Sequence, residues 1–202
     1  MAKKILICGD SFAADWTVKY QNRGLGWPNL LEKNFSVTNV AQAGCGEYKI
    51  YKQIESQDLS QYDFIIVSHT SPYRLHTNFH PIHYKDTLHK NSDFIYKDVK
   101  ERVKTNKESE LISIVNYFEQ YFDIDHAKFV HMLVCKEIEN KLKNFSNVLH
   151  ITPFSWKDFF SFDNMLTIED FPFVTNGLNH YSIEHNHIIY NKILERILKI
   201  NG

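Results

Sequence analysis

The sequence predicts an α/β fold: a three-layer α/β/α sandwich with a mostly parallel, flavodoxin-like sheet. Segments with helical spacing of apolar residues separate most of the strand candidates. Strands that alternate with helices favour an open, parallel sheet with helices on both faces. Four short apolar runs, each bounded by polar or turn residues, have the character of buried strands: Ile5 to Cys8, Val37 to Val40, Phe64 to Val67 and Val148 to Ile151.

The helices between these strands have identifiable beginnings. Pro28 suits the first turn of a helix whose apolar face ends near Phe35, and residues 46–56 form a second expected helix. Thr105 and Glu108 have the spacing of a capping box ahead of apolar residues that run from Leu111 to Phe122. The sequence therefore predicts a third helix that begins near Thr105.

Two more helices are expected toward the C-terminus. Apolar residues recur every four positions from Val130 to Leu142, and Asp125 is the expected N-cap of that segment. Ser182 is the expected N-cap of a last helix, whose apolar residues, from Ile189 to Ile197, would face inward.

Length and composition favour a single domain that spans residues 1–202. A chain of 202 residues, of which 43% are hydrophobic, can bury a substantial core. The stretch that begins at His69 breaks the alternation, because it is polar and long for a simple connection. Residues 69–107 are therefore expected to form a loop or lid insertion near the active site.

Charge and cysteine content limit the classes of partner and the cellular compartment that we expect for this protein. A formal net charge of -1 offers no field that would gather nucleic acid or anionic lipid. The first apolar run stops at Gly9 and is too short for a secretory signal or a membrane span. Three cysteines without a CxxC pair disfavour a disulfide framework and suit a reducing compartment. We expect a cytoplasmic protein with a neutral or small-molecule partner.

The segment Gly9-Asp10-Ser11-Phe12 places a serine hydroxyl where the first strand ends. A parallel strand delivers its last residues to the crevice where ligands bind, although a plain turn would use the same residue types. His180 stands just before the last helix, and the positive end of that helix would help to keep its imidazole neutral, as a general base requires. Ser11 and His180 therefore form a candidate dyad.

In these motifs and their order the chain resembles the SGNH or GDSL-type hydrolases, as a divergent member. The segment around Ser11 is similar to the first motif of that family, in which the serine is the nucleophile and also donates its backbone N–H. Asn39 to Gly44 is similar to the second motif, and Gly44 would supply an N–H to the oxyanion hole. The resemblance implies the three-layer fold of the family and acyl-enzyme chemistry that needs no cofactor.

Two motifs depart from the family pattern. The third, normally Gly-x-Asn-Asp, aligns with His69-Thr70-Ser71-Pro72, so Ser71 would replace the asparagine that donates to the oxyanion. The fourth, Asp-x-x-His, has Gly177 where the triad acid is expected. A backbone carbonyl could orient His180 instead, as could Asn176 through its side-chain oxygen, whereas Asp170 lies upstream but out of register.

Further residues near these motifs are candidates for binding. Asp10, Tyr73 and Arg74 are expected to contact substrate. Gly44-x-Gly46 lacks the third glycine of a dinucleotide fingerprint, so no nicotinamide cofactor is expected. No metal site is expected in the insertion, because metal ligands need convergent geometry and these residues belong to an expected loop: His76, His80, His83, Asp86 and His89.

The expected function is that of a serine esterase or deacetylase that acts on an O-acyl ester, such as a carbohydrate O-acetyl ester. Two alternatives stay open. A carbohydrate O-acyltransferase would share the acyl-enzyme and differ in the acceptor. A non-catalytic carbohydrate- or protein-binding module would retain the fold without the chemistry; Gly177 and Ser71 favour it, whereas Ser11 and His180 favour catalysis.

Overall fold

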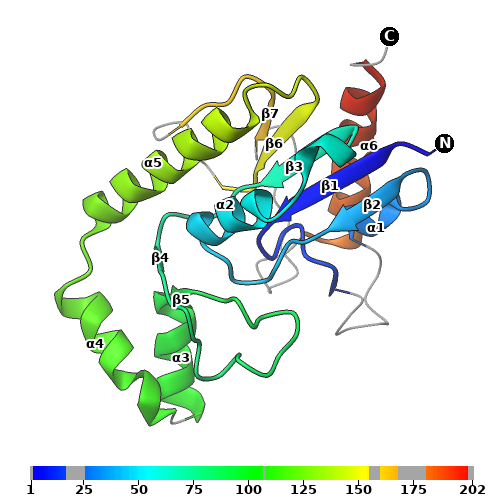
Figure 1. Ribbon diagram of the computed structural model, residues 1–202. Helices are drawn as coiled ribbons and strands as arrows, with labels where there is room; N and C mark the ends of the chain where they lie inside the picture. The colour runs from blue at the N-terminus through cyan, green and yellow to red at the C-terminus, as the bar shows by residue number, and fades with distance from the viewer. Residues whose placement is uncertain (1, 17–25, 107, 155–159, 168–180, 200–202) are drawn as a thin grey trace.

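A five-stranded sheet forms the centre of the protein in the computed structural model (Figure 1). Its strand order is β2-β1-β3-β6-β7, and every neighbouring pair is parallel. This order is flavodoxin-like, and the predicted α/β fold is confirmed. The strands are β1 (Lys4–Gly9), β2 (Ser36–Asn39), β3 (Phe64–Ser68), β6 (Val148–Thr152) and β7 (Met165–Thr167). The structure describes residues 2–16, 26–106, 108–154, 160–167 and 181–199.

Helices cover both faces of this sheet and divide its core in two. Because side chains alternate along a strand, Ile5 and Ile7 of β1 face one layer and Leu6 and Cys8 face the other. α1 and α6 pack on the first face, and α2 and α5 pack on the second. The four helices are α1 (Trp27–Leu31), α2 (Glu47–Glu55), α5 (Ile124–Leu142) and α6 (Ile183–Lys199).

The ends of these helices test the predicted caps. Ser182 caps α6, since its Oγ accepts a hydrogen bond of 3.2 Å from the N–H of His185, as predicted. The N-cap of α5 is Asp123 and not Asp125, because Asp123 Oδ1 accepts from the N–H of Asp125 at 2.9 Å. α1 carries Pro28 in its first turn, as expected, but ends at Leu31 rather than near Phe35.

The chain between β3 and α5 builds a group of elements away from the sheet (Figure 1). The short strands β4 and β5 pair antiparallel, and apolar side chains from this group share a small core of their own around Val99 and Leu111. The role of residues 69–107 as a lid stays a prediction. The elements are β4 (Arg74–Leu75), β5 (Phe94–Ile95), α3 (Tyr96–Asn106), a 3-10 turn at Ser109–Leu111 and α4 (Ile112–Gln120).

The predicted capping box in this region is wrong. Thr105 lies in the last turn of α3, where its Oγ1 donates to the carbonyl oxygen of Glu101 at 2.7 Å instead of capping a new helix. α4 begins at Ile112 with no hydrogen bond from a capping side chain. Within the described residues, no helix combines the length and the apolar character that a membrane span requires.

Candidate functional site

Ser11 lies in a tightly held turn directly after β1, at the carboxyl edge of the sheet. Oδ1 of Asp10 accepts from the N–H of Phe12 at 3.0 Å. Two indole N–H groups fix the following carbonyls, because Trp16 Nε1 donates to the oxygen of Ser11 at 2.8 Å and Trp27 Nε1 to that of Phe12 at 2.9 Å. Ser11 is partly exposed, and its own N–H donates no hydrogen bond to any described residue.

Asp10 joins this turn to the loop after β3. Its side chain is fully buried, and Oδ2 accepts from Thr70 Oγ1 at 2.7 Å and from Arg74 Nη2 at 3.0 Å. Burial raises the pKa of Asp10 to about 6, against the opposing effect of the Arg74 charge. Asp10 thus holds together the two loops that carry Ser11 and Ser71. Its predicted contact with substrate stays a prediction.

Gly44 occupies the turn after β2 with a φ of 80°, a conformation that favours glycine. A Cβ at this position would lie 2.3 Å from Ser92 Oγ and 2.8 Å from Ser92 Cβ. The polar segment before β5 braces the turn, since the N–H of Asp93 donates to the oxygen of Gly44 at 3.0 Å and Ser92 Oγ to that of Ala43 at 2.9 Å. The N–H of Gly44 makes no hydrogen bond within the part of the chain that the structure describes.

The variant Gly44→Ala is expected to lower the free energy of unfolding by about 1–3 kcal/mol, because it combines a left-handed φ with the contact against Ser92. Urea denaturation measures this loss. Gly26→Ala is the matched control, since Gly26 has a φ of -66° and its nearest contact, Pro28 Cδ, lies 3.3 Å away. Ser92→Gly in the Gly44→Ala background should recover part of the loss. Equal losses in the two alanine variants would contradict this reasoning.

Ser71 and Arg74 line a cavity of about 340 Å³, whereas Ser11 does not line it. The Arg74 side chain is only 8% exposed, and Tyr73 beside it is 44% exposed. Ser71 Oγ accepts from the N–H of Tyr73 at 3.3 Å, which shapes the loop after β3. Other lining residues come from α4, α5 and their connection, and include Tyr117, Tyr121, Phe122, His126, Val130 and His131.

His180 and Asn176 lie outside the described residues, so their predicted roles stay predictions. The described neighbour of His180 in the chain is Tyr181, whose ring packs edge-on against Phe12 with centroids 4.9 Å apart. Burial raises the pKa of Tyr181 well above its usual value, and the nearby Asp10 charge adds to this. The chain directly before α6 therefore reaches the residue next to Ser11.

The structure gathers most of the histidines that the sequence placed in the insertion. His83 belongs to two groups of candidate metal ligands, and the ligand atoms in each group lie within 4.8 Å of one another. His76 stands apart from both groups, with its Nδ1 3.4 Å from Asp93 Oδ1. The two groups are His80, His83 and Asp98, and His83, Asp86 and His89.

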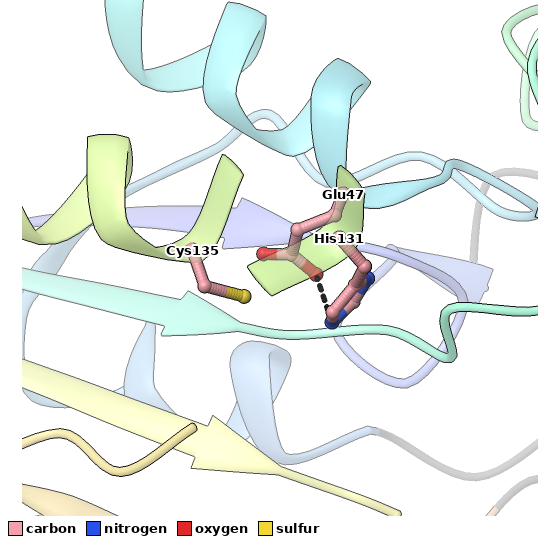
Figure 2. Close-up of side chains that lie close together, drawn as sticks. All are labelled: Glu47, His131 and Cys135. Carbon is pink, nitrogen blue, oxygen red and sulfur yellow. Dashed lines mark ion pairs between the residues drawn. The ribbon is translucent and has the colours of Figure 1, made fainter. Parts of the chain in front are cut away.

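Sequence reasoning missed a buried polar cluster on the α2 and α5 face (Figure 2). Glu47 begins α2, and its Oε1 lies 2.6 Å from His69 Nδ1. Glu47 Oε2 accepts from the N–H of Thr70 at 3.0 Å and lies 4.0 Å from His131 Nε2. Cys135 stands one helical turn after His131 on α5. The spacing of four residues between His131 and Cys135 was the one local pattern by which the sequence could have indicated this cluster, because Glu47 is remote from both in the chain.

Burial controls the protonation of this cluster. It raises the pKa of Glu47 to about 7, with the nearby His131 as the main opposing influence. It lowers the pKa of His131 to about 4 and that of His69 to about 3, so both imidazoles are neutral at neutral pH. The pKa of the Cys135 thiol is raised by the same cause.

Comparisons with known proteins add little to this geometry. No protein-family model matches the chain, and no curated protein matches its sequence. The crystal structure of phospholipase A1 from Streptomyces albidoflavus NA297 is similar at a TM-score of 0.38 and 13% identity, over 100% of this chain and 78% of that chain. A likeness at this level carries no argument about chemistry, so the site must be interpreted from its own residues.

Proposed function

We propose that this protein is a serine esterase whose nucleophile is Ser11. One observation carries the proposal: Ser11, Gly44 and Ser71 follow three adjacent strands, β1, β2 and β3, at the same edge of the sheet. Ligands of open α/β sheets bind at this edge. The buried Asp10 accepts a hydrogen bond from the side chain of Thr70, which is next to Ser71. This contact supports a close approach of the loop after β1 to the loop after β3.

The proposed reaction proceeds through an acyl-enzyme. Ser11 Oγ attacks the ester carbonyl while His180 accepts its proton, and the oxyanion accepts hydrogen bonds from the N–H groups of Ser11 and Gly44 and from Ser71. Collapse of the intermediate expels the alcohol, which takes the proton from His180. Water, activated by the same histidine, then attacks the acyl-enzyme, releases the acid and restores Ser11. Asn176 is proposed to orient the imidazole.

A carbohydrate O-acyl ester is the proposed substrate class. The cavity beside Ser71 is rimmed by exposed tyrosine rings, of which Tyr48, Tyr117 and Tyr121 are 48%, 40% and 71% exposed. Tyrosine offers an apolar ring face together with a hydroxyl that forms hydrogen bonds, a combination that suits a sugar. Ser71 and Arg74, which follow β3, add polar groups to the lining of this cavity.

Labelling with a fluorophosphonate, followed by mass spectrometry of the adduct, tests the proposed nucleophile without knowledge of the substrate. We expect an adduct on Ser11 in the wild type and none in Ser11→Ala or His180→Ala. Ser60→Ala is the control, because Ser60 is exposed and bonds to Asp58 after α2, away from the edge. An adduct on another serine, or none on folded wild-type protein, would overturn the assignment.

A further inference from the structure

Three different potential metal ligands converge beneath the carboxyl edge of the sheet (Figure 2). We propose that Glu47, His131 and Cys135 bind a divalent transition-metal ion of the zinc class through one carboxylate oxygen, one imidazole nitrogen and one thiolate sulfur. Oxygen, nitrogen and sulfur donors of these residue types are the ones that zinc uses in proteins. This inference goes beyond the proposed esterase and does not depend on it.

Two packed helices hold the three side chains in place. His131 and Cys135 share one face of α5 because they are four residues apart, and Glu47 reaches them from the first turn of α2. Figure 2 shows the three side chains directed toward one another, with the Glu47 carboxylate between the other two. All three residues are buried, with exposed fractions of 4%, 5% and 0% for Glu47, His131 and Cys135. The cluster thus belongs to the buried interior of the protein.

The spacing of the donor atoms suits an ion better than a direct hydrogen bond. The candidate ligand atoms all lie within 4.8 Å of one another, and Glu47 Oε2 lies 4.0 Å from His131 Nε2. That separation is too long for a hydrogen bond. Bonds of about 2.0–2.2 Å from zinc to nitrogen and oxygen, and of about 2.3 Å to sulfur, place tetrahedral donors about 3.3–3.6 Å apart, so the three donor atoms must move closer together by at most about 1 Å. Small side-chain rotations would complete the coordination.

Neighbouring groups orient the proposed carboxylate ligand. His69 Nδ1 lies 2.6 Å from Glu47 Oε1, and His69 Nε2 in turn lies 2.8 Å from His150 Nδ1. The N–H of Thr70 donates to Glu47 Oε2, whose second lone pair remains for a metal. Hydrogen bonds of this kind fix the orientation of metal ligands, and their loss typically weakens metal affinity about 10- to 100-fold.

The charge balance of the cluster also suits a cation. In the complex His131 would donate a nitrogen lone pair as a neutral imidazole, while Glu47 and Cys135 would each bind as an anion. The Cys135 thiol loses its proton to solvent when the metal–sulfur bond forms, and Glu47 loses any proton that it carries. The dipositive ion balances the two negative charges that its own binding creates on Glu47 and Cys135.

The cavity of about 340 Å³ supplies both access and an open coordination position. Glu47 and His131 line this cavity together with Ser71 and Arg74. Three protein ligands with a fourth position open to a cavity is the arrangement of reactive zinc sites, whereas structural zinc sites are closed by four protein ligands. A water molecule or a polar group of a ligand in the cavity would take the fourth position.

Cobalt(II) is the probe that tests this site, because it reports its ligands by absorbance. Titration of the metal-free full-length protein is expected to produce visible bands of tetrahedral cobalt and a near-ultraviolet sulfur-to-cobalt charge-transfer band, both displaced by zinc. Cys135→Ser should abolish the charge-transfer band, and His131→Gln should weaken cobalt binding tenfold or more. Binding should also weaken as the pH falls, because protons compete for Cys135 and Glu47.

Matched controls separate this site from other thiols and histidines. Cys45→Ser replaces an equally buried thiol outside the cluster and should retain the band, as should His83→Ala in the insertion. Circular dichroism establishes that each variant folds, and Glu47→Gln replaces Cys135→Ser if the latter does not. Absence of cobalt binding by folded wild type, or a charge-transfer band retained in Cys135→Ser, would overturn the proposal. Cobalt bound without that band and lost in His83→Ala would also overturn it and place the ion in the insertion.

Discussion

Replacement of Ser11 by alanine is expected to lower kcat for the hydrolysis of a short-chain aryl ester by roughly four to six orders of magnitude. The reason is that an acyl-enzyme mechanism has no substitute for the attacking hydroxyl, so only the binding and oxyanion contributions remain. The side chain of Ser11 is partly exposed, and no hydrogen bond of its hydroxyl links it to the described residues. Its removal should therefore leave the free energy of unfolding nearly unchanged.

A graded comparison makes this expectation specific. Ser71→Ala removes one proposed oxyanion donor and should cost at most about 10²- to 10³-fold in kcat, whereas Ser60→Ala should have no effect. Steady-state kinetics on the three variants, with urea denaturation as the check on folding, measures the series. If Ser11→Ala retains wild-type kcat while the protein hydrolyses the ester, the nucleophile is another residue. If Ser71→Ala has no effect, Ser71 does not contact the oxyanion.

Disruption of the buried pair between Asp10 and Arg74 is expected to cost about 3–5 kcal/mol of unfolding free energy. Asp10→Ala leaves a guanidinium that is 8% exposed without its carboxylate, and it also deprives Thr70 Oγ1 and the N–H of Phe12 of their acceptor. Burial raises the pKa of Asp10 to about 6, so the measurement belongs well above that pH, where the carboxyl is ionised. Urea denaturation at such a pH gives the loss.

A double-mutant cycle tests the physical cause of this loss. Asp10→Asn combined with Arg74→Met removes both charges, and its cost should be smaller than the sum of the two single costs. Lys52 and Glu55 supply the control, because they form an exposed ion pair on α2 that solvent screens, and its removal should change stability far less than removal of the buried pair. Additive costs for the buried pair, or equal costs for the two pairs, would show that the Asp10–Arg74 contact does not hold the loops together.

Several elements were predictable because their causes are local. The strands β1 and β3 were identified from continuous apolar runs, and β2 and β6 from short runs that polar residues interrupt. The expected burial is wrong for β2, in which every residue is exposed or only partly buried. The N-cap at Ser182 was identified from a side chain that contacts the first turn of its own helix. β7 was not predicted, since three residues are too few to show a pattern. The helix over Tyr96–Asn106 was also missed, because its polar sequence buries only Val99.

Some features of the predicted site likewise have local causes, whereas others depend on contacts between distant segments. The positions of Ser11 and Gly44 after β1 and β2 follow from local sequence, since each residue lies in the turn that follows its strand. The structural role of Asp10, which joins the loops after β1 and β3, could not be predicted. Its partners Thr70 and Arg74 lie on another loop, and the depth of its burial depends on the assembled sheet. The brace of Gly44 by Ser92 likewise joins two segments that no local pattern connects.

Apolar periodicity and turn chemistry alone were enough to establish the α/β class and the placement of candidate residues at strand ends, because both act over a few neighbouring residues. The convergence of Glu47, His131 and Cys135 was decided only by the tertiary structure. It depends on how α2 and α5 pack over the sheet, and that packing is determined by the side chains of the whole interface between them. Contacts between distant elements are a property of the assembled core, and for this reason the buried cluster had no counterpart in the sequence analysis.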